Sequence, residues 1–78
     1  MKLPRAVSGQ RVIRAPEHLG YEVIRRRGSH VRLQHPGPPV HAVTVPLHAA
    51  LKIGTLHGIL AEVAQMRSTT IKHLCELI

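Results

Sequence analysis

Two turn-forming segments in the middle of the chain constrain its fold more than any other feature. One is Gly28-Ser29, and the other is Pro36-Gly37-Pro38-Pro39, which no regular helix or strand accommodates. Between them, from His30 to His35, apolar Val31 and Leu33 alternate with polar residues, the period-two pattern of a half-buried β-strand. Because connections this short join antiparallel strands, we expect a sheet of consecutive hairpins.

The segments on either side of these turns predict the neighbouring strands. Tyr21–Arg27 contains several β-forming residues, and in Val40–Val45 two valines alternate with small or polar residues. If the apolar side chains of the central strand pack on a core, the opposite face of the sheet carries His30, Arg32 and Gln34.

Three helices complete the expected layout. Ser8 can cap a first helix that Gly20 ends, while Pro16 requires that helix either to kink or to end and restart at the proline. Thr55 is expected to cap a second helix and Ser68 a third. The apolar residues that follow each cap have helical spacing: Leu56, Ile59, Leu60 and Val63 in the second helix, and Ile71, Leu74, Cys75 and Ile78 in the third.

The order of elements predicts one α+β domain over residues 1–78, with the helices on one face of a three-stranded antiparallel sheet. This is the α-β-β-β-α layout of double-stranded-RNA-binding domains, with an extra C-terminal helix. A chain of 78 residues is too short for two domains, and its core is thin.

Charge and composition narrow the function classes. Eleven Lys and Arg against four acidic residues give a net charge of +7, which is typical of a domain that binds a polyanion. The single cysteine, Cys75, excludes an internal disulfide, and there is no CxxC pair for zinc. We see no signal peptide and no apolar run long enough to span a membrane, so we expect a cytoplasmic protein.

His30 is the strongest candidate for catalysis. A neutral imidazole can accept the proton of an RNA 2′-hydroxyl, and an imidazolium can protonate a leaving oxygen. Arg32 and the run Arg25-Arg26-Arg27 can hold a phosphate and stabilise its transition-state charge. Taken alone, the same residues also fit an ordinary solvated strand.

A second phosphate-binding position is the start of the helix at Thr55, with Lys52 just before it. Alternatively, Thr55 only caps the helix. The other histidines match no compact metal-ligand spacing, and the chain has no carboxylate cluster and no phosphate-binding loop, so we expect neither a metal nor a cofactor.

Three segments in order resemble the motifs of the HicA-type toxins: Gly28-Ser29-His30, Val45-Pro46-Leu47-His48 and the stretch from Leu51 to Leu56, followed by Ile59-Leu60. The resemblance runs from about Ser8 to the C-terminus. It implies a double-stranded-RNA-binding-domain fold and a ribosome-independent messenger RNA endonuclease of a toxin–antitoxin pair, active in growth arrest or stress response. The histidine that matches His30 is the family's catalytic residue, and a HicB-type antitoxin covers the active face. His48, His57 and His73 are all candidates for a second acid or base, which a one-histidine mechanism leaves open. With the residues above, the expected RNA-binding set is Arg25, Arg26, Arg27, Ser29, Arg32, Lys52 and Thr55.

Two other functions share the same basic face. One is an RNA-binding module without catalysis, whose RNA affinity falls steeply with salt. The other is a small basic regulator that binds an acidic protein.

Overall fold

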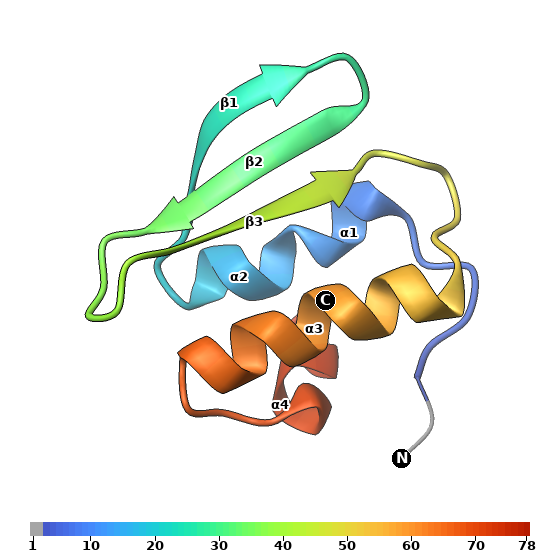
Figure 1. Ribbon diagram of the computed structural model, residues 1–78. Helices are drawn as coiled ribbons and strands as arrows, with labels where there is room; N and C mark the ends of the chain where they lie inside the picture. Colours follow the sequence, from blue (N-terminus) through green and yellow to red (C-terminus); the bar gives the residue numbers. More distant parts are fainter. Residues whose placement is uncertain (1–2) are drawn as a thin grey trace.

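In the computed structural model, which describes residues 3–78, three antiparallel strands are covered on one face by helices (Figure 1). This confirms the expected α+β layout; the first two residues of the expected domain lie outside the described residues. Within residues 3–78, no helix is both long enough and apolar enough to cross a membrane. The elements in chain order are α1 (Gly9–Val12), α2 (Arg14–His18), β1 (Glu22–Arg27), β2 (His30–His35), β3 (His41–Pro46), α3 (Ile53–Met66) and α4 (Ile71–Cys75).

The strand order is β1-β2-β3, with both pairs antiparallel, so the two outer strands follow the expected hairpins. The predicted alternation of β2 is also confirmed. Val31 and Leu33 are buried with Val43 and Val45 of β3, whereas His30 at the start of β2 is exposed.

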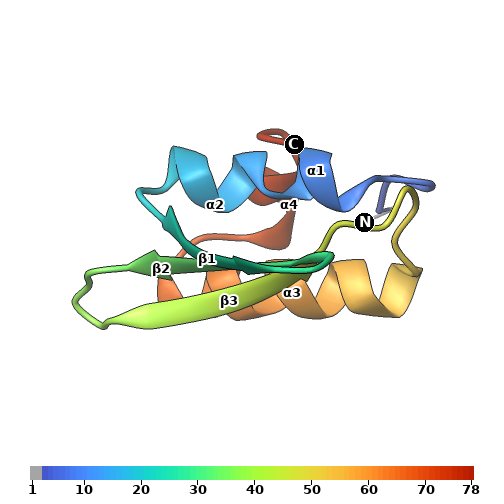
Figure 2. The same cartoon turned by 90° about the horizontal axis from the view of Figure 1, so that it is seen from above.

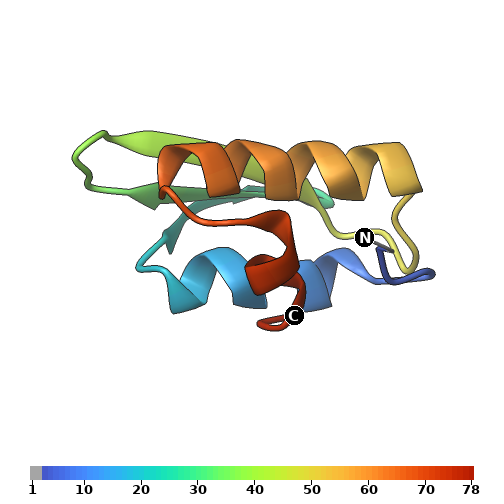
Figure 3. The ribbon, with the colours of Figure 1, turned by 90° about the horizontal axis from the view of Figure 1, so that it is seen from below.

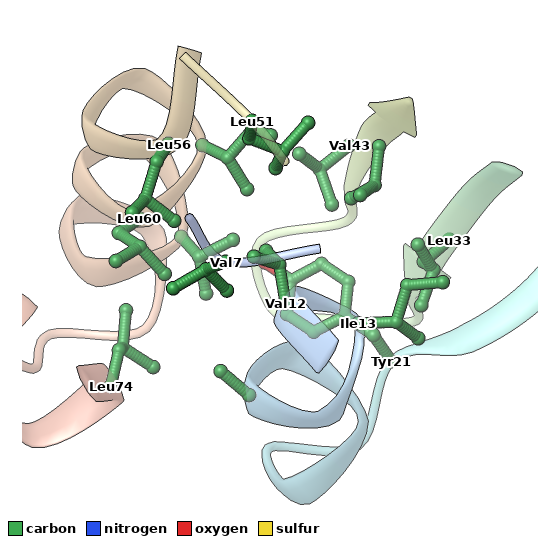
Figure 4. Close-up of a cluster of buried hydrophobic side chains, with 14 of the residues drawn as sticks. Val7, Val12, Ile13, Tyr21, Leu33, Val43, Leu51, Leu56, Leu60 and Leu74 are labelled. Atoms are coloured by element: carbon green, nitrogen blue, oxygen red, sulfur yellow. The ribbon is translucent and has the colours of Figure 1, made fainter. Parts of the chain in front are cut away.

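The helices form the second layer. Figures 2 and 3 show α3 and the α1–α2 segment running alongside each other, and in Figure 3 α4 lies between them. Side chains from both layers meet in one core, where Leu33 and Val43 of the sheet face α1 and α3 (Figure 4). Cys75 of α4 packs against this core, as expected for a small apolar side chain. Its burial raises the pKa of the thiol, and the nearby Glu76 carboxylate adds to this effect.

The first helix is interrupted, but not at Pro16. Ser8 caps α1 as expected, its hydroxyl accepting a hydrogen bond from the Arg11 amide at 3.2 Å. The interruption lies at Ile13, because Pro16 has no N–H to donate to the carbonyl of Val12 four residues earlier. Pro16 itself lies in the first turn of α2, where a missing amide hydrogen costs little.

Gly20 ends α2 as expected. Its φ of +100° lies in the left-handed region that glycine adopts without strain, and its amide donates to the Glu17 carbonyl. The Tyr21 amide donates to the Pro16 carbonyl, which completes the paired closing bonds of a glycine-terminated helix.

Two expected helix starts were wrong. α3 begins at Ile53 after Lys52, so Thr55 lies within its first turn and does not cap it. The first amides of α3 lie in an exposed segment and can be solvated, so no side-chain cap is needed there. α4 is capped by Thr70, whose hydroxyl accepts from the His73 amide, whereas Ser68 has a φ of +54° in the turn that follows α3.

Candidate active site

A β-bulge in β1 determines which arginines share a face with His30. Val23 lies opposite Leu33, but the register then shifts at Ile24, so that Arg25 lies opposite Arg32 and Arg27 opposite His30. Opposed residues of an antiparallel pair project to the same face. Without the extra residue, strict alternation would place Arg25 on the helix side with Val23. The bulge therefore places Arg25 and Arg27 of β1 on the same open face of the sheet as Arg32 and His30 of β2.

These side chains enclose a shallow depression of about 120 Å³ on the open face of the sheet, lined by Arg25, Arg27, His30, Arg32 and Thr44. Arg32 is oriented by a hydrogen bond from its Nη1 to the Thr44 hydroxyl at 3.0 Å. The lining contains three guanidinium groups, one imidazole and no carboxylate. Such a set can hold a phosphate by charge-assisted bonds and place an acid–base group beside it.

The backbone around His30 is held by a second segment of the chain. His30 follows the turn residues Gly28 and Ser29 and lies opposite Pro46 across the β2–β3 pair. The Leu47 amide donates to the Ser29 carbonyl at 2.5 Å, which joins the Gly-Ser-His turn to the Val-Pro-Leu-His segment. As a result, the ring of His48 lies 6.5 Å from the ring of His30, measured between centroids, at an interplanar angle of 74°.

The other expected RNA-binding residues do not all converge on this depression. Arg26 lies opposite Val31 on the helix side and lines a separate cavity with Arg11 and Arg14 of the first helical segment. Thr55 shares with Arg32 and Thr44 a wider groove between β3 and α3. Ser29 is exposed in its turn, and exposed Lys52 precedes α3.

Two of the remaining histidines make hydrogen bonds within the fold. His41 is buried, with the Tyr21 hydroxyl 2.6 Å from its Nδ1 and a Glu62 carboxylate oxygen 2.8 Å from its Nε2. His35 accepts at Nδ1 from the Gly37 amide at 2.9 Å and from Arg67 at 2.5 Å. Burial raises the pKa of Tyr21, an effect that the Arg67 guanidinium opposes and the Glu62 carboxylate reinforces.

Sequence reasoning missed Thr44 as the partner of Arg32, and it did not distinguish His48 from His57 and His73 as the source of a second acid or base. The Val23-Ile24 pair, two apolar neighbours in a strand that should alternate, was the available signal for the bulge. No local pattern indicates that His48 approaches His30, because the loop after β3 brings them together.

Comparison with protein families matches residues 9–65, about three quarters of the chain, to a family described as HicA toxin of bacterial toxin-antitoxin. The matched span contains every residue of the depression and also His48. No curated protein and no solved structure matches the chain.

Proposed function

Because the chain belongs to the HicA toxin family of bacterial toxin–antitoxin systems, we propose that it is a metal-independent endoribonuclease that cleaves messenger RNA with His30 as a general acid or base. The observation that carries the proposal is the depression on the open sheet face, where exposed His30 lies among three arginines and Thr44.

The chemistry fits a phosphodiester with a neighbouring 2′-hydroxyl. An imidazole that exchanges protons near neutral pH can serve the attacking or the leaving oxygen. Arg25, Arg27 and Arg32 bind the phosphate and stabilise the charge that develops on its oxygens. Ser29, Lys52 and Thr55 extend the RNA-binding surface around it, whereas Arg26 faces away and is not assigned to the site.

The donor set supports a mechanism that needs no metal. Two-metal nucleases hold their ions with clustered carboxylates. Over residues 3–78, the His, Cys and Glu side chains form no group of three or more able to hold a metal ion. Glu62, which lines the neighbouring groove between β3 and α3, is hydrogen-bonded to His41.

The decisive experiment is cleavage of a long messenger RNA by the purified chain and by His30→Ala, with a metal chelator present throughout. We expect the wild type to cut and His30→Ala to bind RNA but to cut about 10²–10⁴-fold more slowly, the usual contribution of one acid–base group. His18→Ala, which removes an exposed histidine from α2, is the matched control and should cut normally. If the wild type binds RNA but does not cut it, the proposal is wrong and the chain is a non-catalytic RNA-binding module.

Membership of a toxin–antitoxin family implies an antitoxin partner. We propose that this partner is of the HicB type and inhibits the toxin by covering the His30 face. Growth arrest on expression of the chain should therefore be relieved by the co-expressed antitoxin. His30→Ala should not arrest growth, and it should still bind the antitoxin.

A further inference from the structure

The seven histidines of the chain divide by their surroundings. His35 and His41 make hydrogen bonds within the fold, and His73 of α4 lies 3.7 Å from the Glu76 carboxylate. His18 and His57 are exposed on helices. His30 and His48 are also exposed, and they lie close to each other with their rings 6.5 Å apart.

The backbone of His48 is held on two sides. The Leu47 amide donates to the Ser29 carbonyl at 2.5 Å, next to His30. The His48 carbonyl accepts from the Gly9 amide at 3.0 Å, at the start of α1. Both bonds use backbone atoms, so they fix the position of His48 while its imidazole stays free for chemistry.

We propose that His48 is the second acid–base group of the RNA cleavage reaction and acts on the oxygen opposite to the one served by His30. The inference rests on the proposed function and names the group that a one-histidine mechanism lacks. A hydrogen bond from ring nitrogen to oxygen spans about 2.7–3.2 Å. Two exposed imidazoles with centres 6.5 Å apart can therefore reach two oxygens of a single phosphodiester.

The reaction balances with these two groups alone. The neutral imidazole accepts the 2′-hydroxyl proton while the 2′-oxygen forms a bond to phosphorus. The bond from phosphorus to the 5′-oxygen breaks, and the other histidine, as imidazolium, gives its proton to that leaving oxygen. The products are a 2′,3′-cyclic phosphate and a 5′-hydroxyl, and exchange with water restores the two protonation states.

The test compares His30→Ala and His48→Ala on a short RNA and on the same RNA with sulfur in place of the bridging 5′-oxygen at the cleaved bond. A thiolate leaves without protonation, so the second substrate does not need the general acid. We expect each variant to cut the ordinary RNA about 10²–10⁴-fold more slowly than the wild type. On the sulfur substrate, one of the two should approach the wild-type rate, which identifies it as the variant lacking the acid.

The controls separate chemistry from structure. His48→Gln keeps a hydrogen-bonding side chain but cannot exchange a proton, so it should be as slow as His48→Ala, while His18→Ala should match the wild type. Unchanged cleavage by His48→Ala, with His30→Ala inactive, would overturn the role of His48 and leave the proposed function intact. Failure of the sulfur substrate to rescue either variant would also overturn it. Absence of cleavage by the wild type would instead reject the proposed function itself.

Discussion

At the scale of single residues, His41 is a buried polar side chain whose two ring nitrogens both have partners. With the proton of the neutral imidazole on Nε2, the Tyr21 hydroxyl donates to Nδ1 and Nε2–H donates to the Glu62 carboxylate, so all three groups are satisfied. These two hydrogen bonds join the segment before β1 to β3 and to α3. Arg67 lies over the ring of Tyr21, 5.8 Å from its centroid, and also donates to the Pro39 carbonyl.

The alkaline titration of Tyr21 tests this environment. Burial raises the pKa of its hydroxyl above the ordinary value of 10.0. A group whose pKa is raised on folding adds stability that is complete below its unfolded pKa and is lost as pH rises through the folded one. Since Tyr21 is the only tyrosine and there is no tryptophan, near-ultraviolet absorbance follows it alone. The native chain should ionise at higher pH than the chain in urea; coincident curves would contradict a buried hydroxyl.

Thr44 provides a second residue-scale prediction. Thr44→Val keeps the shape of the side chain but removes the acceptor that orients Arg32. A hydrogen bond contributes about 1 kcal/mol, so RNA cleavage should slow roughly 3- to 10-fold. Thr44→Ser keeps the hydroxyl and should cut at nearly the wild-type rate. Equal rates for the valine and serine variants would show that this hydrogen bond does not matter to the reaction.

At the scale of elements, the sequence predicted the strands far better than the helix ends. β2 has the predicted bounds because Gly28-Ser29 and the proline-rich turn leave it no freedom at either end. Helix starts were placed at Thr55 and Ser68 on the assumption that a hydroxyl caps each helix. α3 instead begins without a side-chain cap, and a local pattern cannot show that solvent satisfies those amides.

The contact between α1 and β3 depends on Gly9. A Cβ at Gly9 would lie 1.9 Å from the Pro46 carbonyl oxygen, so Gly9→Ala must separate two backbone segments. We expect it to lower the free energy of unfolding by about 1–3 kcal/mol, as overpacking usually does. Gly58→Ala is the opposite control, because nothing lies within 4 Å of its added methyl group. Replacing a glycine inside α3 should raise the free energy of unfolding by about 0.5–1 kcal/mol. Urea unfolding of both variants checks the two predictions. An unchanged free energy of unfolding in Gly9→Ala would contradict the close approach of Gly9 to Pro46.

At the scale of the whole molecule, the two-layer architecture leaves one face of the sheet free of helices (Figure 1). The sequence predicted this face and the exposure of His30, because a strand that alternates must show one of its faces to water. It could not predict that Arg26 leaves the face or that His48 joins it. The first depends on a bulge in the pairing of β1 with β2, and the second on backbone bonds from the loop after β3.

The separation of arginines between the two sides of the sheet gives a prediction about the salt dependence of RNA binding. Log affinity falls as log salt rises, and each lost phosphate contact to single-stranded RNA should make that slope less steep by roughly 0.7. In a His30→Ala background, which we expect to slow cleavage, Arg25→Ala and Arg27→Ala should each reduce the slope by that amount. Arg26→Ala, the same change in the same strand but on the helix side, should leave the slope unchanged. Equal losses at all three positions would mean that RNA senses only the net charge of +7 and does not dock on the His30 face.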